Sequence, residues 1–152
     1  MEFHGINKLN LDAKGRLAMP ARLKSKLMEY CNGEMVVTID VKEKCLLIYP
    51  YPEWQDVQRR ARALPGMHKK TNRMQRMLIG HAMDVQLDAS GRILLPPPLR
   101  EHAELEKQVV LVGQTNKLEL WDDLLWAAYM KRCNEEEQRD EDEPPELREF
   151  SW

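Results

Sequence analysis

The chain has 152 residues, 43% hydrophobic and 32% charged, which suits one ordinary globular domain or two very small ones that share a core. The formal net charge of −2 is unevenly spread: residues 1–80 carry fifteen basic and eight acidic residues, whereas residues 81–152 carry eight basic and seventeen acidic residues. No apolar run approaches the roughly 18 residues of a membrane-spanning helix, and the first ten residues lack the features of a signal peptide. We therefore expect a soluble cytoplasmic protein with no membrane partner.

The first predicted elements are a hairpin and a helix. Apolar residues at 6–11 and 17–19 flank a turn at residues 12–15, which predicts a short β-hairpin. Pro20 suits the start of a helix because its missing N–H costs nothing in the first turn, and residues 21–30 have apolar side chains on one face.

Another hairpin and two helices complete the first half. The apolar runs 35–39 and 46–49 predict the hairpin, and helical spacing of apolar residues predicts an amphipathic helix over residues 52–64. A basic helix follows over residues 69–83. We interpret its charges as a solvated face above an apolar stripe rather than as a DNA-recognition surface, because a run of charges on a helix usually forms a face that is exposed to water.

The second half repeats this order. A hairpin turns at residues 88–91, a helix is expected to start near Leu99 because three prolines precede it, and a hairpin over 109–121 leads into an amphipathic helix over 122–133. A hairpin, a helix and a hairpin are too small to bury a core alone. We therefore expect two copies packed about a pseudo-two-fold axis.

The turn of the first hairpin lies in the segment LDAKGRLAMP, and 76 positions later the chain reads LDASGRILLP. Asp12 can accept hydrogen bonds from backbone N–H groups of the turn, and Gly15 can supply the positive φ that closes it. Arg16 lies four residues after Asp12, close enough for the carboxylate to hold the guanidinium in one orientation. The same three roles in the second copy belong to Asp88, Gly91 and Arg92.

Three functions are compatible with this turn. The ion pair can simply stabilise it, the oriented arginine can bind a phosphate or the acceptor edge of guanine, or two symmetric aspartates can form an acid–base dyad as in aspartic proteases. An arginine beside each aspartate would keep both carboxylates ionised, which disfavours the dyad. No other motif predicts an active site or a cofactor site, so we expect no enzyme, no cofactor and no small-molecule substrate.

The cysteines and histidines give no sign of a metal site. Cys31, Cys45 and Cys133 have no CxxC spacing, and the four histidines fall in no zinc-binding pattern, so we expect free thiols in a reducing compartment and no metal.

The segments FHGINKLNLDAKGRLAMPARL, LDASGRILLPPPLR, QRMLIGHAMDVQLD and VLVGQTNKLELWD together resemble the MraZ family of bacterial regulators, over residues 1–133. The resemblance implies an α+β, mainly β fold: tandem, pseudo-two-fold, swapped-hairpin half-domains of the AbrB type that form a small double-psi-like barrel, flanked by amphipathic helices. The corresponding ranges are residues 1–52 and 81–122 for the half-domains, 53–80 for the connecting helices, 123–134 for the C-terminal helix and 135–152 for an acidic tail expected to be disordered.

The resemblance also implies a function. The family's members regulate a division and cell-wall gene cluster, assemble into a closed ring and bind direct repeats of double-stranded promoter DNA through these loops. The resemblance thereby places Asp12, Lys14, Arg16, Asp88 and Arg92 in loops that face DNA. We assign DNA contact to Lys14, Arg16 and Arg92, and we add Lys8 for its proximity to the first loop. The chemistry of the turns assigns the orienting role to Asp12, Gly15, Asp88 and Gly91. We therefore expect a nucleoid-associated repressor, with an oligomeric scaffold that binds no specific DNA as the alternative.

The two loops differ at one cationic position. The first has Lys14 where the second has Ser90, so we expect the first loop to dominate DNA contact.

Overall fold

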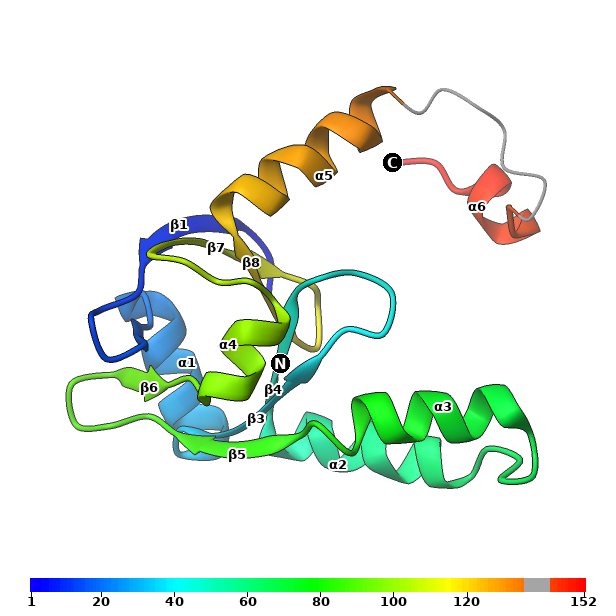
Figure 1. The fold of residues 1–152 in the computed structure, drawn as a ribbon, viewed down its shortest axis with the longest axis horizontal. Coiled ribbons are helices and arrows are strands. Elements are labelled where there is room, and N and C mark those ends of the chain that lie inside the picture. The colour runs from blue at the N-terminus through cyan, green and yellow to red at the C-terminus, as the bar shows by residue number, and fades with distance from the viewer. Residues whose placement is uncertain (136–142) are drawn as a thin grey trace.

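A six-stranded antiparallel sheet is the centre of the fold in the computed structural model, which describes residues 1–135 and 143–152 (Figure 1). Its strand order is β1-β7-β8-β4-β3-β5. Strands β2 and β6 form a second, two-stranded sheet, the β2–β6 ladder. The strands are β1 Ile6–Asn10, β2 Arg16–Ala18, β3 Glu34–Ile39, β4 Leu46–Pro50, β5 Met83–Gln86, β6 Arg92–Leu94, β7 Gln108–Gly113 and β8 Leu118–Asp122. The helices are α1 Ala21–Cys31, α2 Tyr51–Arg62, α3 Lys69–Leu78, α4 Pro97–His102, α5 Asp123–Glu135 and α6 Pro145–Glu149.

The two halves of the chain exchange strands. β1 pairs with β7 and β5 pairs with β3, while β4 pairs with β8 and β2 pairs with β6. The hairpins predicted around the turns at residues 12–15 and 88–91 are therefore wrong, because the strands on either side of each turn pair with the other half of the chain. Of strand pairing, only an isolated bridge from Leu11 to Leu17 joins the two sides of the first turn in the described residues. Each strand thus contacts a strand of the other half. In the two copies β1 corresponds to β5, β3 to β7 and β4 to β8, so the order of the sheet read from β1 matches the order read from β5. This order fits a pseudo-two-fold axis between β4 and β8.

The predicted mixture of helices with a mainly antiparallel sheet is confirmed, but the small closed barrel is not. In the described residues β1 and β5 are the two edges of the sheet, and β2 and β6 pair only with each other within their ladder, so no strand pairing joins the edges. Both edge strands are short and carry exposed polar residues such as Lys8 and Asp84, which suit a sheet edge in contact with water.

Side chains alternate between two apolar layers, one on each face of the sheet. One layer packs the sheet against α1, α4 and the β2–β6 ladder, and it includes Leu17, Leu27, Ile48, Ile93, Leu99 and Leu111. The other packs the sheet against α2 and α5, and it includes Val36, Cys45, Tyr49, Trp54, Val110 and Trp121. The repeated turns therefore adjoin the first layer.

Proline positions explain two differences from the expected helices. α4 begins at Pro97 rather than near Leu99, because prolines are tolerated in the first turn, where the N–H groups have no partner within the helix. Pro145 begins α6 in the same way within the acidic tail, where the sequence predicts no structure. Residues 136–142 of that tail lie outside the described residues.

α2 and α3 form a helical pair that projects away from the repeated turns (Figure 1). Met77 at the end of α3 packs against one apolar layer and Leu78 against the other, while Lys69, Arg73 and Arg76 are exposed. These positions fit a solvated basic face above an apolar stripe, and the absence of a DNA-recognition role for this face stays a prediction. The helix is shorter than the predicted range of residues 69–83, since α3 ends at Leu78 and β5 begins at Met83. None of the helices in the described part of the chain has both the length and the apolar character that a bilayer crossing requires.

Leu111, at the centre of β7, offers a test of the apolar layer between the sheet and α1 and α4. Its side chain is fully buried, and its neighbours across the strands are Asn7 of β1 and Leu120 of β8. Leu111→Ala should lower the free energy of unfolding by about 2–5 kcal/mol, measured by denaturant titration. Leu124→Ala on α5, where the side chain is 77% exposed, should change it by less than about 0.5 kcal/mol. Equal losses in the two variants would contradict this assignment of the core.

Candidate nucleic-acid interface

The first repeated turn holds its arginine through a single aspartate. Asp12 Oδ1 accepts hydrogen bonds from the backbone N–H groups of Lys14 at 2.9 Å and Arg16 at 2.8 Å. Asp12 Oδ2 accepts a hydrogen bond from Arg16 Nε at 2.6 Å. Gly15, at φ +80°, donates its N–H to the carbonyl oxygen of Asp12 and closes the turn. The predicted orienting role of Asp12 therefore matches this geometry.

The second turn repeats the backbone arrangement but holds its arginine less tightly. Asp88 Oδ1 accepts hydrogen bonds from the N–H groups of Ser90 at 2.8 Å and Arg92 at 3.0 Å, and Gly91 has φ +76°. Arg92 Nε lies 3.3 Å from Asp88 Oδ2, but its geometry does not make a hydrogen bond, and this buried atom has no hydrogen-bond partner among the described residues. The two turns thus differ in their arginine contacts as well as at Lys14 and Ser90.

The β2–β6 ladder brings the two turns together. In its antiparallel register Arg16 lies opposite Leu94, and Ala18 lies opposite Arg92. Arg92 Nη1 is 3.9 Å from Asp12 Oδ2, so the carboxylate of the first turn has an ion pair with the arginine of each copy. Figure 1 shows the β1–β2 and β5–β6 turns side by side at one end of the molecule.

Each turn is also braced by the other half of the chain. Leu95 donates its N–H to the carbonyl oxygen of Gly15 at 3.1 Å, and Met19 donates to Gly91 at 3.0 Å. The side chain of Arg100, on α4, lies directly against Gly15, where a Cβ atom would be 2.5 Å from its Cζ. Lys24 of α1 lies against Gly91 in the same way. Glycine at both positions therefore provides room for a cationic side chain as well as a positive φ.

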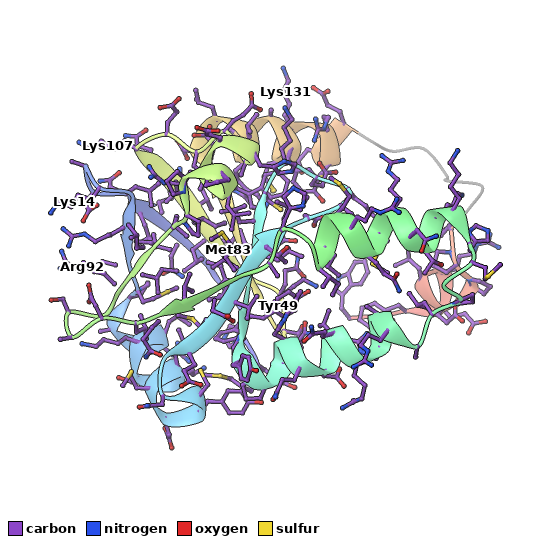
Figure 2. The ribbon with its side chains drawn as sticks, turned by 60° about the horizontal axis from the view of Figure 1, so that its bottom comes forward. Lys14, Tyr49, Met83, Arg92, Lys107 and Lys131 are labelled. Carbon is purple, nitrogen blue, oxygen red and sulfur yellow. The ribbon has the colours of Figure 1, made fainter. Side chains whose placement is uncertain are left out.

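Two cationic residues near the first turn were not among the predicted site residues. Arg100 contacts the turn from a distant part of the sequence, and Lys107 accepts a hydrogen bond at its carbonyl oxygen from the N–H of Leu11 at 2.8 Å. Figure 2 shows Lys107 at the same end of the molecule as Lys14 and Arg92. The 76-residue repeat makes Arg100 the counterpart of Lys24. This correspondence is the feature of the sequence from which the position of Arg100 near a turn could have been predicted.

Lys8 is the predicted contact residue that this geometry supports least. It is exposed in the middle of β1, opposite Val110, and it lines a small cleft with Asp123. Among the described residues no ion pair or side-chain hydrogen bond joins Lys8 to either turn. Lys14 is also exposed, but it lies within the first turn itself.

Both aspartates of the turns have a lowered pKa. The backbone N–H of Arg16 has the largest effect on the pKa of Asp12, and that of Arg92 has the largest effect on the pKa of Asp88, with the guanidinium groups lowering both further. Both carboxylates are therefore ionised at neutral pH. An aspartic-protease dyad instead shares a proton, which requires one raised pKa, so this pair does not suit that chemistry.

The exposed cations of the two turns suit a polyanion at this surface. A hydrogen bond to Asp12 orients Arg16, and ion pairs with Asp88 and Asp12 hold Arg92. Their side chains are still 29% and 33% exposed, so both guanidiniums are open to solvent. A guanidinium fixed in this way can make paired hydrogen bonds with a phosphate group or with the major-groove edge of guanine.

Comparisons with known proteins give one consistent result. The family model described as "MraZ protein, putative antitoxin-like" matches the chain twice, at residues 3–77 and 78–148. A protein of Halorhodospira halophila named transcriptional regulator MraZ is 56% identical over 124 residues, which cover 82% of each chain. A protein of the same name from Thioalkalivibrio sulfidiphilus is 49% identical over 144 residues, or 95% of this chain and 93% of the relative. One from Pseudomonas putida is 52% identical over 126 residues, which cover 83% of each chain.

The cause of the low aspartate pKa values can be tested by carbon-13 NMR titration of the side-chain carboxyl groups. Asp12 and Asp88 should both titrate below the ordinary value of 3.8 in the folded protein. In Arg16→Ala, the pKa of Asp12 should rise but stay below that value, because the backbone N–H that has the largest effect remains.

The same shifts fix the pH dependence of stability. A pKa that is lower in the folded state stabilises the fold fully above the unfolded-state pKa, and this stabilisation is lost as the pH falls through the folded-state pKa. An Asp12 pKa at or above 3.8 in Arg16→Ala would contradict this account, because it would show that the guanidinium, rather than the backbone N–H groups of the turn, lowers the pKa of Asp12.

Proposed function

The chain belongs to the MraZ family, and from this premise we propose that it is a transcriptional regulator that binds specific sequences of double-stranded DNA. The names of its relatives support a role in transcription regulation, and they describe regulators rather than a class of enzyme. We further propose that the repeated turns bind the DNA and that several subunits bind together.

One observation carries the assignment of the DNA-binding surface: the convergence of two aspartate-oriented arginines. Asp12 Oδ2 lies 2.6 Å from Arg16 Nε and 3.9 Å from Arg92 Nη1. The two guanidiniums therefore lie on one surface, to which Lys14 adds an exposed cation. Arginines are well suited to phosphate and base-edge recognition because their donors are planar and fixed in direction. Asp12, Gly15, Asp88 and Gly91 orient these cations in the proposal.

Several subunits are needed for tight binding. Lys14, Arg16 and Arg92 alone neutralise only a few phosphates, and the affinity from so few contacts is weak at physiological salt. A closed ring would present several copies of the paired turns to direct repeats in promoter DNA, and the linked contacts would raise the overall affinity. We propose that this assembly represses the division and cell-wall gene cluster that contains its own gene, as a nucleoid-associated protein.

The two turns contribute unequally in this proposal. The first turn has the tighter arginine contact and the additional cation Lys14, whereas the second has a looser contact at Arg92 and the neutral Ser90. The first turn should therefore supply more of the binding energy.

The assignment of Arg16 can be tested by fluorescence anisotropy with DNA from upstream of the protein's own gene. Arg16→Ala should weaken binding by about 1–3 kcal/mol per contact, because an oriented cation is removed. Arg132→Ala is the matched control, since this arginine is 60% exposed on α5 and pairs with Glu43. Unchanged affinity in a folded Arg16→Ala protein would contradict the proposal and favour the oligomeric scaffold.

The inequality of the turns can be tested with exchanged residues at the same turn position. Lys14→Ser should make the plot of log K against log salt concentration less steep, by about 0.9 for each phosphate that the lysine neutralises, and Ser90→Lys should make it steeper. Lys42→Ser, an exposed change in the β3–β4 connection, should leave the slope unchanged. A slope that does not respond to Lys14→Ser would rule out a phosphate contact at this lysine.

A further inference from the structure

Three possible metal ligands meet at a place remote from the repeated turns. Asp40 follows β3, Cys45 precedes β4 and Glu119 belongs to β8. One ligand atom of each residue lies within 4.8 Å of those of the other two. Cys45 belongs to the apolar layer beneath α2 and α5, whereas the residues that support the turns belong to the layer on the opposite face of the sheet. The cluster is therefore separate from the proposed DNA-binding surface.

The sheet holds these donors in place. Asp40 donates its backbone N–H to the carbonyl oxygen of Cys45 at 3.1 Å, which closes the β3–β4 connection. Glu119 lies opposite Leu47 in the pairing of β4 with β8, two residues beyond Cys45. Residues two apart on a strand share a face, so Cys45 and Glu119 point to the same side of the sheet.

Each donor keeps an atom available for a ligand. Asp40 Oδ1 accepts hydrogen bonds from backbone N–H groups, that of Lys42 at 2.7 Å, and Glu119 Oε1 accepts one from Trp121 Nε1 at 3.1 Å. The second oxygen of Asp40, Oδ2, accepts only the weak hydrogen bond of the Cys45 thiol among the described residues, and a metal ion would replace that proton. The Cys45 side chain is fully buried, and its Sγ has only a long contact of 3.9 Å to Asp40 Oδ2 among the described residues. A buried thiol is thus directed at two carboxylates.

Negative charge gathers around Cys45. Lys117 is a cation that acts on Glu119, while the third nearby carboxylate, Glu43, is paired with Arg132, whose Nη2 lies 3.6 Å from Glu43 Oε2. Two carboxylates so close together at a half-buried position favour a bound cation of higher charge than a single lysine.

We propose that Asp40, Cys45 and Glu119 bind a divalent transition metal of the zinc class. Zinc accepts both sulfur and oxygen ligands, whereas magnesium and calcium take oxygen ligands alone. Zn–S and Zn–O bonds of about 2.3 and 2.1 Å place tetrahedral ligands roughly 3.5 Å apart, so the 3.9 Å between Cys45 Sγ and Asp40 Oδ2 needs only a small closure. Cys45 binds as the thiolate and releases its proton to solvent, and water completes the four ligands.

The duplication of the chain shows that the fold alone does not require these residues. Gln114 donates its N–H to the carbonyl oxygen of Lys117 at 2.9 Å, as Asp40 does to Cys45, so these two pairs are equivalent positions of the two copies. The position equivalent to Glu119 in the first copy is Leu47, and these two residues lie opposite each other where β4 pairs with β8. The equivalent place has the same backbone but holds Gln114, Lys117 and Leu47, which do not form a metal site. We therefore expect one metal ion per chain.

Titration of the metal-free protein with Co²⁺ tests the site, because a cobalt–thiolate bond gives a charge-transfer absorption in the near ultraviolet. The full-length chain should show this band with a stoichiometry of one Co²⁺, and Zn²⁺ should displace it. Cys45→Ser should abolish the band, whereas Cys133→Ser, which removes the exposed thiol of α5, should retain it. Glu119→Gln keeps an acceptor for Trp121 Nε1 and should weaken Co²⁺ binding at least about tenfold.

Absence of the band in the unmodified protein would overturn the proposal, as would its survival in Cys45→Ser. Circular dichroism of each variant separates loss of a ligand from loss of the fold. If Cys45→Ser does not fold, Asp40→Asn replaces it, since the asparagine oxygen can still accept the Lys42 N–H. Unchanged Co²⁺ affinity in that variant would equally overturn the proposal.

Discussion

The pairing of β2 with β6 is the constraint on which the proposed DNA-binding surface depends. Each strand has only three residues, too few for stability alone, and both are held because their apolar side chains enter the layer between the sheet and α1 and α4. Since the strands are antiparallel and directly follow the two turns, their pairing places both arginines on one surface. The Asp12 carboxylate then lies near both guanidiniums, and each glycine turn rests against a cation from the other half.

Features that depend on neighbouring residues could be predicted from the sequence. The two turns and the capture of Arg16 by Asp12 follow from contacts within about five residues, and the structure contains them. The contact of Arg100 with Gly15 could not be predicted in this way, because it depends on which strands exchange partners. The closed barrel was implied by resemblance alone, and the described residues form an open sheet because no strand pairing joins β1 to β5.

Duplication has preserved the backbone more closely than the side chains. The same turn geometry carries Lys14 in one copy and Ser90 in the other, and the same hairpin closure carries Cys45 in one copy and Lys117 in the other. The exchanged strands require apolar residues in both copies because both enter a shared core, whereas turn residues and half-buried hairpin residues can diverge. This division allows a symmetric scaffold to present two unequal turns and one cluster of metal ligands.

Hydrogen–deuterium exchange of the full-length protein, with and without DNA from upstream of its own gene, tests the central claim most directly. If the paired turns bind DNA, the amides of residues 12–16 and 88–92 should exchange more slowly in the complex, with the larger change in the first turn. The amides of α2 and α3, which project from the other end of the molecule, should exchange at the same rate with and without DNA. Slower exchange in α2 and α3 together with unchanged exchange in both turns would contradict the claim.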